Sequence, residues 1–175
     1  MFFADTIAEM SKFMDSGGMV LWAIVVLFFL MWALIFERMW YLKTTVSIDV
    51  QGALASWSER KERKSKHAHQ IREKLISEVS IEIDNNMMMI KTLVAVAPLF
   101  GLLGTVTGMI TVFDVMAFTG GGDAKAMAGG VSKATIPTMS GMVAALSGVF
   151  GLTYIERIAE REKHLLEDHL MLEHK

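Results

Sequence analysis

The 175-residue sequence contains no cysteine, only two prolines and only two tyrosines. Without cysteine the chain can form no disulfide, offers no thiol nucleophile and supplies no thiolate ligand for a zinc site. Its formal net charge is −2, so it lacks the basic excess that is typical of nucleic-acid-binding domains. These absences exclude cysteine chemistry and give no support to a nucleic-acid partner.

Apolar side chains, in contrast, make up 53% of the chain, and the mean hydropathy is +0.41. Three runs carry no charged residue: Met19–Phe36, Thr92–Phe113 and Ala134–Ile155. Each is close to the roughly 20 helical residues that cross a hydrocarbon layer about 30 Å thick. The alternative is a soluble bundle with three buried helices. Such helices would need polar faces, and the first run has none, so we predict three transmembrane helices.

Lysine and arginine are distributed unevenly around these runs. Ten of them lie between Arg38 and Lys91 and four follow Ile155, whereas Lys12 alone precedes the first run. Under the positive-inside rule, the middle segment and the tail lie in the cytoplasm. The N-terminus and the glycine-rich link before the third run then lie outside, on the opposite side of the membrane, and three spans satisfy this parity.

The segments between the spans have helical patterns. Apolar residues recur every four positions along Ile71, Leu75, Val79, Ile83 and Met87. Behind the third span, Ile158, Leu165 and Leu172 recur every seven positions. Neither proline nor glycine follows Gly151, so the third span is predicted to continue as one long helix.

The predicted fold is therefore an all-α membrane protein with three transmembrane helices and long helical cytoplasmic extensions. Its segments are a periplasmic amphipathic N-terminus at 1–18, spans at 19–36, 92–114 and 131–155, a cytoplasmic helical region at 37–91, a short periplasmic loop at 115–130 and a cytoplasmic C-terminal helix at 156–175.

The second and third spans differ from the bulky first span because they contain small and hydroxyl-bearing residues. The glycines that we expect to allow close helix packing are Gly101, Gly104, Gly108, Gly141 and Gly148. Thr105 and Thr138 are the notable hydroxyl groups. Each hydroxyl either bonds back to its own helix, as threonine often does in membranes, or lines a polar path or grips a partner helix.

None of the three uncharged runs contains Asp, Glu or His, which are the usual proton carriers inside membranes. If the chain works in a proton-driven machine, the titrating acid must come from another subunit. All five histidines lie in the predicted cytoplasmic parts, and the sequence has no HExxH motif and no nucleophile elbow. We therefore expect no enzyme activity, no metal site and no cofactor.

Two stretches of the chain resemble a known family. Residues 97–109 read APLFGLLGTVTGM, and residues 130–145 read GVSKATIPTMSGMVAA. These closely resemble the second-span and third-span signatures of the ExbB/TolQ/MotA proton-channel family. The likeness is strong over residues 92–155 and greatest to ExbB-type members, which energise TonB-dependent uptake.

The resemblance implies an inner-membrane ring, generally a pentamer, around a dimer of single-span ExbD-like helices. A membrane aspartate on that partner carries the proton, and a TonB-like energy transducer passes the force to the outer membrane. The second and third spans line the central pore, where Thr105 and Thr138 match two pore-facing threonines. The resemblance thus implies a proton-motive-force-driven scaffold.

Lys133 departs from the family pattern because ExbB and TolQ proteins commonly carry an acid there. A cation at this span edge either anchors the helix at the interface, beside membrane lipid, or contacts a partner's acid.

Two other functions stay open from sequence: a TolQ-like subunit of the Tol-Pal envelope and division system, and a small transporter that acts alone.

Overall fold

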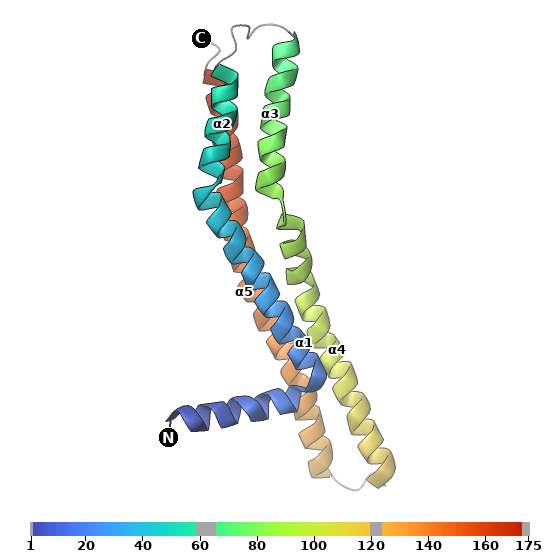
Figure 1. The fold of residues 1–175 in the computed structure, drawn as a ribbon. Helices are drawn as coiled ribbons and strands as arrows, with labels where there is room; N and C mark the ends of the chain where they lie inside the picture. The colour runs from blue at the N-terminus through green and yellow to red at the C-terminus, as the bar shows by residue number, and fades with distance from the viewer. Residues whose placement is uncertain (1, 59–65, 120–123, 173–175) are drawn as a thin grey trace. The chain divides into compact units, whose positions relative to one another are not determined.

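The computed structural model describes residues 2–58, 66–119 and 124–172. Its elements are five α-helices: α1 (Phe2–Thr44), α2 (Val46–Ser58), α3 (Lys66–Asp84), α4 (Met87–Thr119) and α5 (Ala124–Leu172). The predicted all-α fold is confirmed for these residues (Figure 1). Three helical stretches within them are long and apolar enough to cross a membrane: Gly17–Thr44, His69–Phe118 and Met127–His169.

The chain divides into two compact units. The first contains the described residues of Met1–Trp32 and Thr92–Val149, and the second contains those of Ala33–Lys91 and Phe150–Lys175. The first unit therefore holds most of the uncharged runs. The second holds most of the charged residues.

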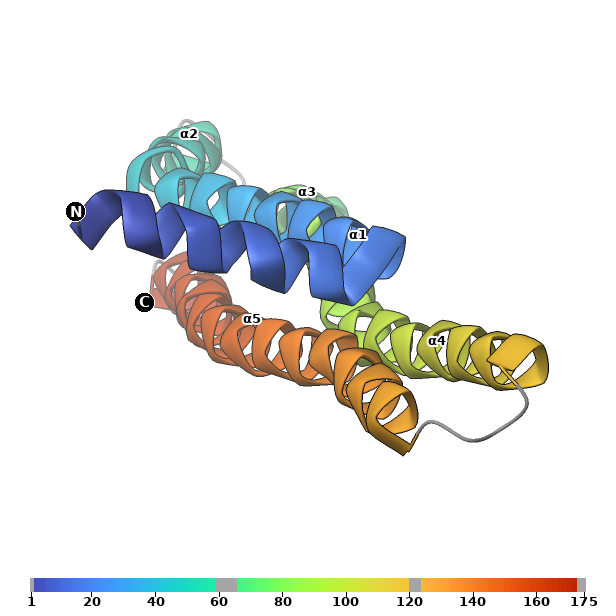
Figure 2. The same ribbon diagram turned by 90° about the horizontal axis from the view of Figure 1, so that it is seen from below.

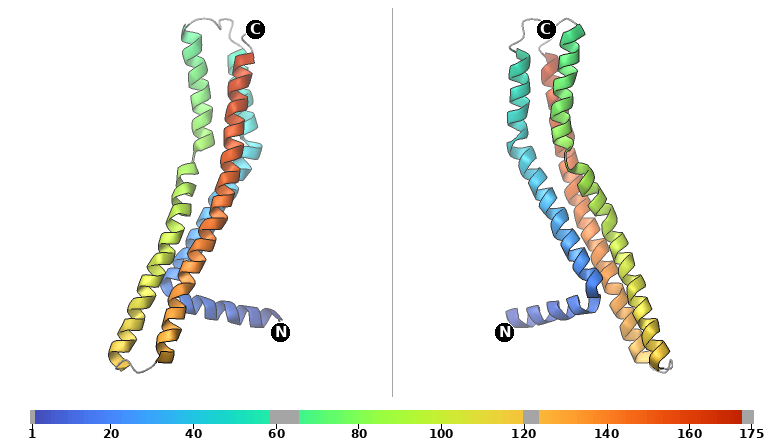
Figure 3. Two further views of the ribbon diagram at one scale, coloured as in Figure 1. Left: turned by 180° about the vertical axis from the view of Figure 1, so that it is seen from behind. Right: turned by 45° about the vertical axis from the view of Figure 1, so that its right-hand side comes forward.

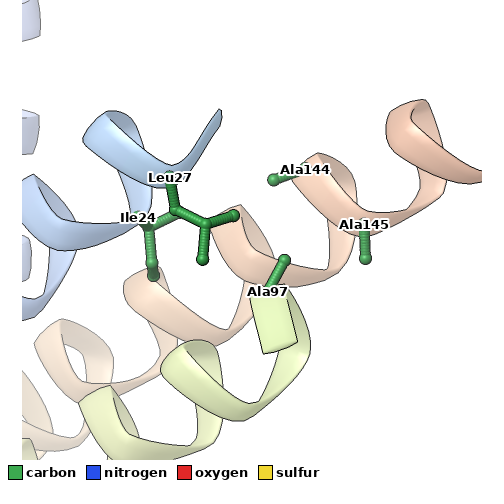
Figure 4. Packing of buried hydrophobic residues seen from close by; sticks show 5 residues of the cluster. All are labelled: Ile24, Leu27, Ala97, Ala144 and Ala145. Atoms are coloured by element: carbon green, nitrogen blue, oxygen red, sulfur yellow. The ribbon is translucent and has the colours of Figure 1, made fainter. Parts of the chain in front are cut away.

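The core of the first unit is built from helices that approach closely. Its buried residues are Ile24 and Leu27 on α1, Ala97 on α4, and Ala144 and Ala145 on α5 (Figure 4). Farther along α5, Gly148 lies against Met31 of α1 and Val94 of α4. Lipid tails are as apolar as these side chains, so helix association in a membrane depends on van der Waals packing, which small residues favour.

The outer surface of the first unit is also apolar. On α1 the side chains of Met19, Trp22 and Phe29 are 88%, 59% and 67% exposed. Large exposed apolar residues continue along α4 and α5, as at Leu99, Leu102, Val106, Ile110, Phe113, Met139, Met142 and Val143. A water-soluble monomer rarely exposes so continuous an apolar surface. This surface belongs against lipid or other subunits, which agrees with the predicted membrane protein.

In the first unit, α4 and α5 run antiparallel and side by side (Figure 3). A Cβ atom added to Gly141 would lie 2.7 Å from the carbonyl oxygen of Ala97 and 3.0 Å from the Cα of Gly101. One added to Gly101 would lie 3.0 Å from the Cα of Thr138. The two backbones are thus in direct contact at this point, which only glycine permits.

The close approach continues toward the other end of the pair. A Cβ at Gly104 would meet the ring of Pro137, and one at Gly108 would lie 2.6 Å from the Cβ of Ala134. We call the four glycines Gly101, Gly104, Gly108 and Gly141 the glycine seam between α4 and α5. Each of the four is among the glycines expected from the sequence to allow close packing, and each lies at this interface.

Helix α1 changes direction at Gly18, whose backbone angles are φ 62° and ψ −158°. Figures 1 and 2 show the N-terminal part of α1 turning sharply away from the part that follows Gly18. Only glycine readily adopts this region of backbone space, because a Cβ atom would clash with the neighbouring carbonyl groups. The predicted segment boundary at residue 18 coincides with this kink.

In the second unit, α3 buries the predicted stripe at Val79 and Ile83. The predicted helical region does not run unbroken into α4. Helix α3 ends at Asp84, and Asn86 takes φ 60°, a left-handed conformation that asparagine tolerates better than most residues. Lys163 of α5 forms an ion pair with Asp84 at 2.6 Å, and Lys91 of α4 pairs with Glu156 of α5 at 2.7 Å.

Helix α5 is one continuous helix, as predicted, but it buries a different row of side chains from the predicted heptad. Ile155, Ala159 and Leu166 are buried, whereas Ile158 is half-buried and Leu165 is 39% exposed. The predicted Leu172 has no described side chain. The buried row follows Gly151, which packs against Ile35 of α1. The contact of Gly151 with Ile35 therefore determines which face of α5 is packed. The heptad spacing indicates the neighbouring face.

We predict that replacing Gly141 with alanine destabilises the chain by about 1–3 kcal/mol, because the added methyl would overlap backbone atoms that cannot move aside. Gly129→Ala is the matched control in the same helix, since a Cβ there meets no atom within 4 Å. The control should stabilise by roughly 0.5–1 kcal/mol through helix propensity. Thermal unfolding in detergent micelles measures both. Equal midpoints for the two variants would refute the glycine seam.

A second prediction concerns the kink. Gly18→Ala should lower stability by about 1–3 kcal/mol, because alanine cannot adopt the Gly18 backbone angles without strain. The substitution causes no steric clash, since a Cβ at Gly18 would meet no atom within 4 Å. Gly52→Ala, at an equally open position within α2, should be neutral or stabilising. A Gly18→Ala variant that unfolds at or above the wild-type temperature would show that α1 does not require this kink.

Candidate functional site

The hydroxyl of Thr138 bonds to a neighbouring helix. Its Oγ1 donates to the carbonyl oxygen of Gly101 at 2.9 Å, which joins α5 to α4 at the glycine seam. The side chain is half-buried. Of the two arrangements considered for this residue, the structure shows the grip on another helix, here within the same chain. Hydrogen bonds of this kind between membrane helices contribute about 0.6 kcal/mol on average.

Thr105 behaves differently from Thr138. Its Oγ1 donates to the carbonyl oxygen of Leu102 in its own helix, at 2.7 Å. In a regular α-helix the backbone amide of Thr105 donates to the carbonyl of Gly101. The hydroxyls of the two threonines therefore donate to carbonyl groups of consecutive residues in α4, Thr138 to that of Gly101 and Thr105 to that of Leu102.

The hydroxyls of Thr107 and Thr111 also bond within α4. The Thr107 hydroxyl reaches the carbonyl oxygens of Leu103 at 3.0 Å and Gly104 at 3.1 Å, and Thr111 donates to the carbonyl of Thr107 at 3.1 Å. A hydroxyl that donates to a carbonyl keeps lone pairs for accepting a hydrogen bond. These groups can therefore accept a hydrogen bond from water or from a protonated acid, but they do not titrate.

One polar contact was not found from the sequence. The indole Nε1 of Trp32 on α1 donates to the Oγ of Ser147 on α5 at 3.3 Å, and that hydroxyl donates to the carbonyl of Ala144 at 2.7 Å. The available signal was the tryptophan itself, because an indole N–H within a membrane span needs an acceptor.

Lys133 lies exposed on α5, at one end of the glycine seam, and Asp114 lies exposed on α4. Lys133 lines a cleft of about 880 Å³ between α1, α4 and α5 of the first unit. Asp15 of α1 lines the same cleft. The lysine that departs from the family pattern thus borders a space within its own chain.

The three uncharged runs lie within the described part of the chain, so their side chains can be surveyed. Their polar groups are hydroxyls and indoles, with no carboxylate or imidazole among them. Among the described residues, no group of three His, Asp or Glu side chains is placed to hold a metal ion. The candidate site is therefore a set of hydroxyl groups at a helix interface, and it contains no titratable group.

The comparisons with known proteins agree with the motifs. Residues 43–168 match the MotA/TolQ/ExbB proton channel family, and this range includes both stretches that carried the resemblance. The ExbB-like protein 1 of Synechocystis sp. is 44% identical over 61 residues, which cover 33% of this chain and 24% of that protein.

Two other relatives are named biopolymer transport protein ExbB. The one from Xanthomonas campestris is 31% identical over 83 residues, which cover 47% of this chain and 33% of the relative. The one from Helicobacter pylori is 34% identical over 71 residues, which cover 41% and 49%. The chain thus matches less than half the length of each of these relatives. Because the family match covers most of the chain, the protein belongs to the MotA/TolQ/ExbB proton channel family.

Proposed function

We propose that this chain is the membrane scaffold of a motor in the bacterial inner membrane that is driven by the proton-motive force. In this proposal, copies of the chain form a ring, generally a pentamer, around an ExbD-like dimer of single-span helices. The complex acts on a TonB-like transducer to energise transport across the outer membrane. The N-terminus lies in the periplasm and the C-terminus in the cytoplasm.

The observation that carries the proposal is the pairing of a proton-channel family with three uncharged runs, 19–36, 92–113 and 134–155, that contain no Asp, Glu or His. Proton transfer through a membrane normally uses carboxylates or histidines. Here the spans offer hydroxyl groups, which can accept a hydrogen bond but cannot carry a proton through a cycle of ionisation. The titrating carboxylate must then belong to a partner, and the scaffold surrounds it with polar oxygen atoms.

The exposed apolar surface of α4 supports assembly into an oligomer. Leu102, Val106 and Ile110 are 58%, 51% and 55% exposed in the single chain. Packing against further copies would cover this surface, while the glycine seam keeps α4 and α5 together as one wall of the pore. In the ring, Thr105 and Thr138 would face the partner helix.

The ExbB names of the relatives favour the TonB system over the Tol-Pal system.

The energy of a single proton limits the mechanism. One charge that crosses 100 mV releases about 2.3 kcal/mol, so mechanical work on an outer-membrane transporter needs repeated cycles. A rigid scaffold suits such cycling, because energy that deformed the ring would not reach the partner. The Thr138–Gly101 hydrogen bond and the glycine seam provide that rigidity within each subunit.

We predict that Thr138→Val and Thr105→Val each reduce proton-coupled uptake while the complex still assembles. Valine keeps the shape of threonine but removes the oxygen that would face the proton carrier. The measurement is siderophore-dependent growth of cells that rely on this chain, with the mass of the purified complex as the assembly control. Thr138→Ser, which keeps the hydroxyl, should restore growth. Full growth of both valine variants would rule out a pore role for these threonines.

We also predict that the chain reconstituted alone in liposomes carries no proton current above that of empty liposomes. The physical reason is that its three uncharged runs contain no Asp, Glu or His to carry a proton. A pH-sensitive dye inside the vesicles, with a potassium-valinomycin potential across them, measures the current. Proton flux from the chain alone would show that the acid need not come from a partner.

A further inference from the structure

The cleft beside Lys133 has an apolar wall contributed by three helices. Its lining includes Met19 and Val20 of α1, Leu103 and Val112 of α4, and Pro137 of α5. Glycines at positions 18 and 129 also line it, and a Cβ atom added to either would meet no atom within 4 Å. The chain's own side chains therefore leave space unfilled at both glycines.

The wall of this cleft offers few polar groups. Its threonines, Thr107 and Thr111, both donate their hydroxyl protons to backbone carbonyls of α4, so each can only accept a further hydrogen bond. An ordered water needs two to four polar partners, which the apolar side chains of the wall do not supply. The main part of the cleft is thus suited to a hydrocarbon chain, which is the most abundant apolar material around a membrane protein.

Two charges of opposite sign border the same cleft. Lys133 reaches it from α5 and Asp15 from α1, and both side chains are exposed. In the described part of the chain these two groups form no ion pair with each other, so both are available to an occupant. A phosphate complements Lys133, and a primary ammonium group complements Asp15.

We propose that the cleft binds a phospholipid with an amine headgroup, such as phosphatidylethanolamine. An acyl chain lies along the apolar wall beside Gly129, the phosphate pairs with Lys133, and the ammonium group pairs with Asp15. An anionic lipid without the amine satisfies Lys133 but brings its negative charge close to Asp15. This inference concerns the lipid environment of each subunit and does not depend on the motor function.

Native mass spectrometry of the full chain tests the proposal. The purified protein is mixed with equal amounts of phosphatidylethanolamine and phosphatidylglycerol, and the lipids retained per subunit are counted. The wild type should retain phosphatidylethanolamine several-fold better than phosphatidylglycerol. Gly129→Leu, which places a side chain in the open space, should lower the retention of both lipids several-fold. Gly52→Leu is the matched control, since a Cβ at this position on α2 meets no atom within 4 Å and Gly52 does not line the cleft.

The charge variants separate the two headgroup contacts. Lys133→Gln should weaken the retention of both lipids, whereas Asp15→Asn should remove the preference for phosphatidylethanolamine and leave phosphatidylglycerol bound. Thermal unfolding at or above the wild-type temperature confirms that each variant is folded. The proposal fails if Gly129→Leu retains both lipids like Gly52→Leu, or if Asp15→Asn keeps the preference. It also fails if Gly129→Leu changes the number of subunits instead of the lipid count, because a second copy of the chain would then fill the cleft.

Discussion

The candidate site depends on the contact between the backbones of α4 and α5 at Gly101 and Gly141. Inside a membrane the hydrophobic effect does not drive helices together, so association depends on how closely their atoms can pack. The absence of side chains at these two glycines brings the Gly101 carbonyl within 2.9 Å of the Thr138 hydroxyl. A larger residue at either position would separate the helices and leave the hydroxyl without this acceptor. The geometry of the polar site is therefore a consequence of glycine packing.

Much of this arrangement could be predicted from the sequence, because its causes are local. Uncharged runs of about 20 residues indicate membrane spans, and the spacing of glycines and threonines in two of them carries the family resemblance. The acceptors of the two threonines could not be predicted. Thr105 and Thr138 occur in similar sequence surroundings, yet one hydroxyl turns to its own helix and the other crosses to a neighbour. That choice depends on the distance between helices, which a sequence does not state.

Contacts between helices also explain why the apolar periodicity of α5 did not indicate its buried face. A repeat of seven at Ile158 and Leu165 predicts an apolar row, but Ile155 and Leu166 are the residues that the structure buries. The helix is continuous with its membrane-spanning part, so Gly151 against Ile35 determines which face turns inward. Likewise, Gly17 and Gly18 are equivalent in the sequence, and only the backbone angles show that the kink of α1 falls on the second.

The proposed placement of the acid on a partner subunit would have a physical advantage. A charge at the centre of a bilayer costs several kcal/mol unless it is paired or hydrated, and a ring would repeat that cost in every copy. If the partner alone carries the acid, the ring presents neutral oxygen atoms to which the acid can hydrogen-bond one after another. Lys133 fits this division of roles, because it lies at a span edge beside the cleft, where headgroup phosphate can balance its charge. In the function and the lipid site that we propose, the basic residue that departs from the family pattern contacts lipid, and the proton path follows uncharged hydroxyl groups.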